Sequence, residues 1–142
     1  EWIDQITYPK IATNFTHNGH SAKILHTALT DGSYRKHLDL LKVRLAQAMQ
    51  ETIAKLKSIR IEPWIEPKAG IFVWCRLPEG VDAAKIAQFC LSRQVILAPG
   101  NAFSQAQSAG QFIRFNITQS NHDYIYKTLA EALLQESLEK QV

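Results

Sequence analysis

The sequence of 142 residues has few of the features that mark specialised classes of protein. It has only two cysteines, Cys75 and Cys90, which argues against a small disulfide-stabilised fold, and their spacing does not match a metal site. We interpret both as buried thiols in a reducing compartment, and we therefore expect a cytoplasmic protein. No apolar run approaches the roughly 20 residues that a helix needs to span a bilayer, so we expect no membrane partner.

A strong excess of one charge is also absent, because the net charge is only +3. This value is too small to indicate nucleic-acid binding by this chain. Hydrophobic residues make up 46% and charged residues 20% of the sequence, which is ordinary for a globular protein. The length is that of one domain with a sizeable core.

Methionine is nearly missing as well. Met49 is the only one, and the sequence opens with Glu1-Trp2-Ile3. We therefore expect that an upstream segment was removed by processing or that the chain is an excised domain. The sequence alone leaves both alternatives open.

The first third of the chain has weak periodicity at its start. The pairs Tyr8-Pro9 and Asn18-Gly19 favour turns or extended chain, so residues 1–19 are predicted to be an irregular lead-in with at most a short helix. Apolar residues at helical spacing predict a brief helix from His20, which Gly32 ends in a left-handed conformation.

A long amphipathic helix is predicted over residues 34–57, with Ser33 as its N-cap. Two interpretations remain open for it. It is either a hinge helix that joins two domains or an ordinary amphipathic helix packed on a sheet. Its basic residues are not interleaved with aromatic residues, so we interpret them as a solvated face.

Short strands and helices alternate in the remaining chain. The predicted elements are an edge strand at 59–62, a strand at 71–77, a helix at 83–93 capped by Asp82, a buried strand at 95–98, a mobile loop at 105–110, a strand at 111–118 and a closing helix that frays from Glu136. Both faces of strand 71–77 are mostly apolar, so we expect both to be covered. The predicted fold is an α+β domain with a small three- to four-stranded, mostly antiparallel sheet and helices packed on one side.

Arg114 is the strongest candidate for a functional residue. It interrupts the apolar final strand and shares a strand face with Phe112 and Asn116. A guanidinium has five fixed donors, which suit a bidentate interaction with a carboxylate. The alternative is an edge-strand arginine that faces water or pairs with an acidic residue.

Other candidate sites lack supporting residues. His17 and His20 stand three apart, but no further ligands follow at a metal-site spacing. The order of residues does not justify a Ser/His/Asp or Cys/His arrangement. We therefore expect no metal site and no catalytic residue in this chain.

Four runs occur in a characteristic order, at residues 69–74, 77–83, 97–104 and 113–116. Together they resemble the C-terminal small domain of fold-type I, pyridoxal-phosphate-dependent aminotransferases. Residues 32–38 and the long helix are similar to the stretch that leaves the large domain and enters the small one. Residues 113–119 most resemble the MocR branch of GntR-type transcriptional regulators, which fuse a winged-helix DNA-binding domain to an aminotransferase-like domain.

The resemblance implies a role for each part of the chain. Residues 1–30 would be the tail end of a large cofactor-binding domain, and residues 31–142 the small domain with a hinge helix. In the family, the arginine of the final strand binds the α-carboxylate of the amino-acid ligand, and that position is Arg114 here. This assignment is an analogy with the family.

The resemblance also shows which family residues this chain lacks. The lysine that forms the Schiff base, the phosphate-binding loop and the partner of the pyridine nitrogen lie upstream in the family. Lys10, Lys23 and Lys36 do not occupy the lysine motif. We therefore expect pyridoxal 5'-phosphate in the full-length protein but not in this chain alone, which should not transaminate.

Two functions follow from the resemblance. The first is a MocR/GntR-type regulator that senses an amino acid or amine and binds DNA through an absent N-terminal domain. The second is the small domain of a working amino-acid aminotransferase. Under either, the full-length protein is expected to be a homodimer. An unrelated α+β binding module is the third alternative.

Overall fold

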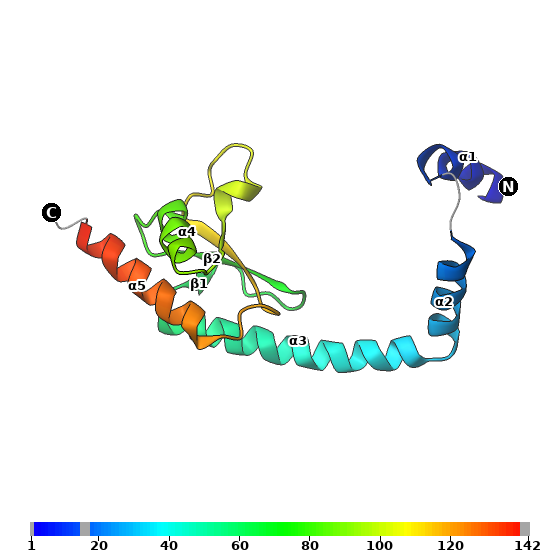
Figure 1. Ribbon diagram of the computed structural model, residues 1–142, viewed down its shortest axis with the longest axis horizontal. Coiled ribbons are helices and arrows are strands. Elements are labelled where there is room, and N and C mark those ends of the chain that lie inside the picture. Colours follow the sequence, from blue (N-terminus) through cyan, green and yellow to red (C-terminus); the bar gives the residue numbers. More distant parts are fainter. Residues whose placement is uncertain (1, 15–17, 140–142) are drawn as a thin grey trace. The chain divides into compact units, whose positions relative to one another are not determined.

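The computed structural model of the chain describes residues 2–14 and 18–139 (Figure 1). The chain divides into two compact units, residues 1–42 and 43–142, and each is described by itself. Helix α3, Ser33–Ser58, begins in the first unit and ends in the second. None of the described helices is both long and apolar enough to cross a membrane.

The first unit is helical from its start. Helix α1 spans Trp2–Asn14 and includes Pro9, so the predicted irregular lead-in and the turn at Tyr8-Pro9 were wrong. The ring of proline fits helical φ, and the helix loses one backbone hydrogen bond at that position. The predicted turn pair at Asn18 instead begins the next helix.

Helix α2, Gly19–Thr30, confirms the brief helix, and Asn18 caps it because its Oδ1 accepts from the N–H of His20 at 2.9 Å. Gly32 has φ +78°, as predicted for a left-handed residue. Helix α3 then begins at Ser33 itself, whose N–H donates to Asp31 Oδ1 at 2.8 Å. The capping carboxylate is therefore that of Asp31, and the prediction of Ser33 as the N-cap was wrong.

The second unit contains a four-stranded sheet in the order β1-β2-β4-β3, with every neighbouring pair antiparallel. The strands are β1 (Glu62–Pro63), β2 (Phe72–Arg76), β3 (Ala98–Pro99) and β4 (Phe112–Asn116). The edge strand thus begins later than predicted. Of the predicted strand 95–98 only Ala98 is paired, and Ile96 is 85% exposed.

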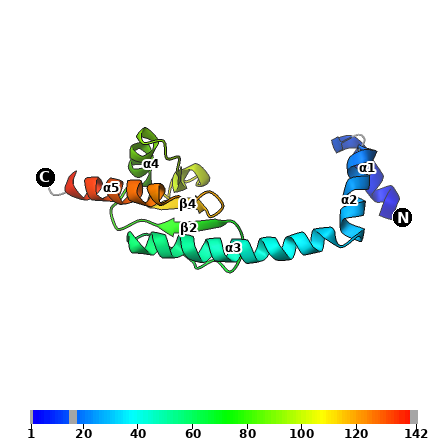
Figure 2. The same cartoon turned by 60° about the horizontal axis from the view of Figure 1, so that its bottom comes forward.

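One face of this sheet forms the core. Val73 and Cys75 of β2 and Ile113 and Phe115 of β4 are almost fully buried. They pack in one hydrophobic cluster with residues of α3, α4 (Ala83–Ser92) and α5 (Asp123–Glu139). Figure 2 shows α3 running alongside the sheet. The predicted α+β domain with helices on one side of a small sheet is confirmed.

Among the described residues, no α-helix covers the second face of the sheet, which is called the open face below. Phe72 is 42% exposed, and Trp74, on the same face, is only partly buried. The expectation that both faces of β2 are covered was therefore wrong for the described chain. Apolar residues on both sides of a strand do not reveal whether the covering group belongs to the same chain.

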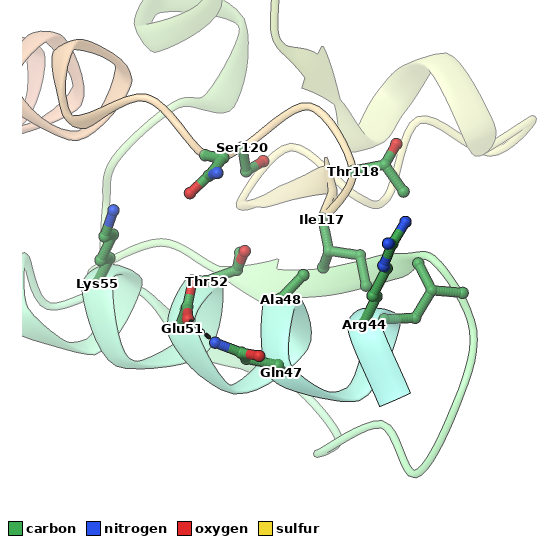
Figure 3. Close-up of a pocket in the computed structure, with 11 residues that line it drawn as sticks. Arg44, Gln47, Ala48, Glu51, Thr52, Lys55, Ile117, Thr118 and Ser120 are labelled. Atoms are coloured by element: carbon green, nitrogen blue, oxygen red, sulfur yellow. Dashed lines mark hydrogen bonds between the residues drawn. The ribbon is translucent and has the colours of Figure 1, made fainter. Parts of the chain in front are cut away.

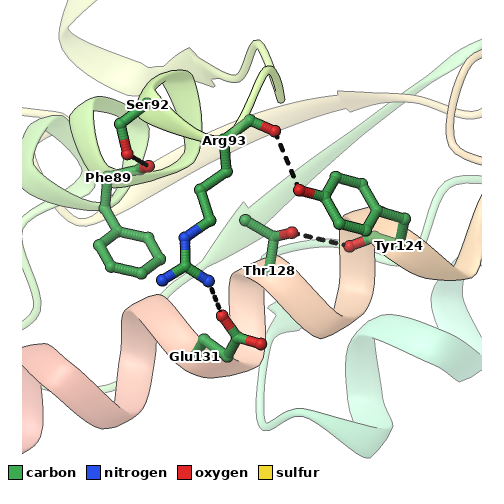
Figure 4. A network of polar contacts seen from close by, with 6 residues as sticks. All are labelled: Phe89, Ser92, Arg93, Tyr124, Thr128 and Glu131. Atoms are coloured by element: carbon green, nitrogen blue, oxygen red, sulfur yellow. Dashed lines mark hydrogen bonds and ion pairs between the residues drawn. The ribbon is translucent and has the colours of Figure 1, made fainter.

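A polar network joins α4 to α5 (Figure 4). The guanidinium of Arg93 pairs with Glu131, and the hydroxyl of Tyr124 donates to the carbonyl of Arg93 at 3.2 Å. At the start of α4, Asp82 Oδ1 accepts from the N–H of Ala84 at 2.8 Å, as predicted for its N-cap. Helix α5 continues through Glu136, which is 6% exposed, so the predicted fraying was wrong over 136–139, and residues 140–142 lie outside the described residues.

Candidate ligand-binding site

The open face of the sheet presents Arg114 near its centre. Because side chains alternate along a strand, Arg114 shares this face with Trp74, its direct cross-strand partner on β2. On its other side Arg114 is paired with Ala98 of β3. Neighbouring strands therefore fix the backbone of Arg114 from both sides, which suits a residue that must present its head group in one position.

Aromatic rings surround the Arg114 guanidinium. Its Cζ lies 4.3 Å from the ring centroid of Phe72 and 3.9 Å from that of Phe103. Phe72 comes from β2, whereas Phe103 comes from the short 3-10 helix η1, Gly100–Phe103. Rings at these distances attract the positive charge and restrict the conformations of the side chain.

One polar atom of the Arg114 side chain is not satisfied within the described chain. Its Nε is buried and has no hydrogen-bond partner. An unpaired buried donor costs about 1–3 kcal/mol, so native structures rarely keep one without a reason. A carboxylate oxygen is the acceptor that best matches this group, because a bidentate pair satisfies two N–H donors of a guanidinium together.

More aromatic side chains extend the same face. Trp74 stacks on Phe112, with ring centroids 5.5 Å apart, and its edge meets Phe103 at 6.0 Å. Trp64 follows β1 at the opposite edge of the sheet and packs against Phe112 and the guanidinium of Arg76. The rings next to Arg114 lower the local dielectric, which strengthens an ion pair made there.

A groove with a volume of about 720 Å³ adjoins Arg114. Its lining residues come from β2, β3, β4 and the segments next to them: Phe72, Gln94, Val95, Ile96, Leu97, Ala98, Arg114, Phe115, Asn116, Gln119, Ser120, His122, Tyr124 and Ile125. Val95 and Leu97 make part of the lining apolar. An arginine beside an apolar groove has the general form of a site for a small organic acid.

A second cavity lies between α3 and the connection from β4 to α5 (Figure 3). Its volume is about 310 Å³, and its lining includes Glu51 and Lys55. Both already have partners, since Gln47 Nε2 donates to Glu51 at 2.9 Å and Lys55 Nζ contacts Asp123 at 2.8 Å. The charged groups of Glu51 and Lys55 are therefore already paired within the chain.

The structure describes the other sequence candidates only in part. His20 is exposed at the start of α2, and His17 lies outside the described residues. No group of three or more His, Cys, Asp or Glu side chains in the described parts of the chain is arranged to hold a metal ion. Cys75 and Cys90 are free thiols that are fully buried in the core.

Sequence reasoning missed Phe103 and Trp64 as neighbours of the site. Both lie outside the strands, so the alternation of residues along a strand says nothing about where their rings point. The only signal available was their aromatic character next to the candidate strands.

The described part of the second unit is an α+β domain with α-helices on one face of a small antiparallel sheet and Arg114, whose Nε has no hydrogen-bond partner, on the other. The sequence profile of the family described as "Aminotransferase class I and II" matches residues 2–132. The chain therefore belongs to the class I and II aminotransferase family.

Relatives in the family include both enzymes and regulators. The chain is 33% identical over 76 residues to aromatic-amino-acid aminotransferase 1 of Thermococcus litoralis, which covers 51% of this chain and 18% of the relative. It is also 33% identical over 90 residues to the uncharacterized HTH-type transcriptional regulator YdcR of Escherichia coli, covering 62% of this chain and 19% of the relative. The chain thus spans less than a fifth of the length of either protein.

Solved structures share the fold over nearly the whole chain. The multiple substrate aminotransferase of Thermococcus profundus aligns with a TM-score of 0.80 and 23% identity over 99% of this chain and 36% of that chain. The kynurenine aminotransferase of Pyrococcus horikoshii aligns with a TM-score of 0.79 and 24% identity over 94% of this chain and 34% of that chain. At this identity the likeness establishes the fold alone.

The residues around Arg114 do not by themselves fit pyridoxal phosphate. The cofactor requires a lysine amine close to the ligand, and no lysine lines the groove beside Arg114. Lys10, Lys23 and Lys36 lie on the helices of the first unit. The described chain therefore supplies a group suited to a ligand carboxylate but no lysine beside it.

Proposed function

We propose that this chain is the carboxylate-binding small domain of a longer, pyridoxal-phosphate-dependent protein, and that Arg114 binds the carboxylate of its amino-acid ligand. The observation that carries the proposal is the guanidinium itself. It lies on the open face of the sheet against Phe72 and Phe103, and its Nε–H is buried without an acceptor.

Exposed apolar residues in the first unit support a longer protein. None of the described residues before position 43 is buried. Trp2, Ile24 and Leu29 are each more than half exposed. Helices with so much apolar surface normally pack against another part of a protein, and we assign that part to a large, cofactor-binding domain of the same chain.

The chemistry of this chain is binding and orientation. Arg114 would hold the carboxylate in one plane through two parallel hydrogen bonds, which a lysine ammonium does not reproduce. The neighbouring rings would exclude water and so strengthen the ion pair. The cofactor, held by the rest of the protein, would supply the electron sink for any chemistry on the bound amino acid.

The full-length protein that we favour is a MocR/GntR-type transcriptional regulator. Residues 113–119 resemble that branch, and the regulator YdcR of Escherichia coli is 33% identical over 62% of this chain. An N-terminal winged-helix domain would bind DNA, and the assembly would be a homodimer. Ligand binding at Arg114 would shift the position of the small domain through α3, acting as a hinge.

A working aminotransferase is the alternative function. The aromatic-amino-acid aminotransferase of Thermococcus litoralis is also 33% identical, over 51% of this chain. In an enzyme, Arg114 would orient the substrate so that the bond to be broken faces the catalytic lysine.

The test uses the full-length protein with its cofactor. Arg114→Ala should raise the Kd for an amino-acid ligand about ten- to a hundredfold, because charge-assisted hydrogen bonds contribute about 1.5–3 kcal/mol. Arg114→Lys should recover only part of this loss. Ligand affinity that is unchanged in Arg114→Ala would contradict the proposal.

DNA binding separates the two functions. A regulator should carry a winged-helix segment before the large domain, and its affinity for operator DNA should change when an amino acid is added. A full-length gene without that segment, together with measurable transamination of an amino acid, would identify the enzyme instead.

A further inference from the structure

Residues 100–110 form a loop that is held by its own hydrogen bonds. Asn101 Oδ1 accepts from the N–H of Ala109 at 3.0 Å. Gln107 Nε2 donates to the carbonyls of Asn101 at 3.3 Å and Ser104 at 3.1 Å, and the N–H of Ser108 donates to Ser104 Oγ at 3.1 Å. The sequence predicted a loop over 105–110, and the structure shows that hydrogen bonds join this loop to Asn101 and Ser104.

The two ends of the loop approach each other closely at Gly100. A Cβ on this glycine would lie 2.3 Å from the carbonyl oxygen of Ala109 and 2.9 Å from that of Phe112. Only glycine fits this contact without movement of the backbone. The N–H of Phe112 also donates to the carbonyl of Ala109 at 3.0 Å, which joins the loop to the first residue of β4.

We propose that this loop serves to hold Phe103 against Arg114, so that Phe103 and Asn101 are positioning residues for carboxylate binding. The proposal deepens the proposed function and rests on it. Phe103 ends the 3-10 helix that starts at Gly100, and its ring lies 3.9 Å from the Cζ of Arg114. Asn101 holds the C-terminal end of the loop in place, because its Oδ1 accepts from the N–H of Ala109.

The exposure of the Phe103 side chain favours this positioning role over a purely structural one. Its side chain is 48% exposed, so its contribution to the core is small. Its ring contacts are with Arg114 and with Trp74, whose ring centroid is 6.0 Å away. The ring therefore acts mainly on the guanidinium of Arg114. It restricts the conformations of that side chain and excludes water from it before a ligand binds.

The experiment compares two probes in the full-length protein with its cofactor. Isothermal titration gives the Kd of 3-phenylpropionate and of 3-phenylpropanamide, which differ only in the carboxylate. The ratio of the two Kd values measures how much the carboxylate itself contributes. A change in general packing would weaken both probes and leave the ratio unchanged.

In the wild type, the acid should bind about ten- to a hundredfold more tightly than the amide. Phe103→Ala should lower this ratio about three- to tenfold, and Asn101→Ala should lower it less. Phe103→Tyr keeps the ring and should restore the wild-type ratio. Phe103→Leu keeps apolar bulk without a ring and should lower the ratio as well.

Trp64→Ala is the matched control. Trp64 is an aromatic residue on the same face with 55% exposure, similar to Phe103, but it packs on Phe112 and Arg76 at the other edge of the sheet. Its removal should leave the ratio unchanged. Circular dichroism melts establish that each variant is folded.

The outcomes separate the two proposals. If Arg114→Ala abolishes the preference for the acid but Phe103→Ala does not lower it, the positioning role is wrong and the proposed function stands. An equal loss in Trp64→Ala also overturns the positioning role. If the wild type has no preference for the acid, or Arg114→Ala keeps it, the proposed function fails and this inference fails with it.

Discussion

Arg114 differs from two other arginines of the same unit in how its charge is satisfied. Arg93 pairs with Glu131, and Arg76 Nη2 donates to Gln111 at 3.4 Å. All three guanidinium groups lie over at least one aromatic ring, but of the three only Arg114 has a buried Nε without a hydrogen-bond partner. A structural arginine is expected to resemble the first two, so the difference supports a ligand as the missing acceptor.

At the same scale, the two cysteines should be chemically inert. Burial raises the pKa of the Cys75 thiol to about 12 and that of the Cys90 thiol to about 11, although the nearby Arg93 opposes the second shift. Only the thiolate is nucleophilic, so at pH 8 fewer than about one in a hundred of either group should be reactive. We expect iodoacetamide to label neither residue in the folded protein, as read by mass spectrometry.

Unfolding provides the control for this prediction. In concentrated urea both thiols should have ordinary pKa values and should be labelled together. Rapid labelling of Cys75 without denaturant would show that β2 does not face the core as described.

At the scale of elements, the end of α4 carries a strained residue. Gln94 has φ +62°, and the N–H of Val95 donates to the carbonyl of Cys90 at 2.9 Å, which is the bond that closes such a helix end. Glycine adopts this conformation without a Cβ penalty, although it costs more conformational entropy on folding. Gln94→Gly should therefore raise the free energy of unfolding by about 0.5–1 kcal/mol.

Urea denaturation measures this change directly. Gly80→Ala is the opposite substitution, because Gly80 has φ +77° and alanine is strained there. It should lower the free energy of unfolding. A Gln94→Gly variant that is less stable than the wild type would contradict the account of this helix end.

The elements also show what the sequence reveals and what it does not. The alternation in 111–118 predicted that Arg114 shares a strand face with Phe112 and Asn116, because side chains in a strand alternate with period two. In the structure, Ile113 and Phe115 on the other face are buried in the core. Pro9 misled the prediction because a helix tolerates proline at the loss of one hydrogen bond. Of the strand predicted at 95–98, only Ala98 pairs with another strand. The prediction failed because strand pairing depends on β4, which is distant in sequence.

The site itself was predictable only in part. Arg114 was found as a charge in an apolar strand, but the ring of Phe103 reaches it through a loop whose shape depends on Asn101 and Gly100. Such a loop leaves no periodic signal in the sequence. Arg114 could therefore be predicted from the sequence, whereas the contact of Phe103 with its guanidinium could be found only in the structure.

At the scale of the whole molecule, the two units should differ in stability. The described residues that are buried all lie in residues 43–142, and none lies in the first unit. Burial of apolar surface supplies most of the stability of a domain. Residues 43–142 expressed alone should therefore fold cooperatively and melt within a few degrees of the whole chain.

The complementary fragment is the control. Residues 1–42 alone should show little helix by circular dichroism, since isolated short helices without a packed face are marginal in water. If removal of the first unit abolished the cooperative transition of residues 43–142, the division into these two units would not describe how the protein folds.

The central claim is that Arg114 binds the carboxylate of a ligand. A crystal structure of the full-length protein with its cofactor and 3-phenylpropionate tests this claim most directly. The account predicts both carboxylate oxygens at about 2.7–2.9 Å from nitrogen atoms of Arg114, with the ring of Phe103 against the guanidinium. A carboxylate bound elsewhere, with Arg114 paired to an acidic side chain of the large domain, would contradict it.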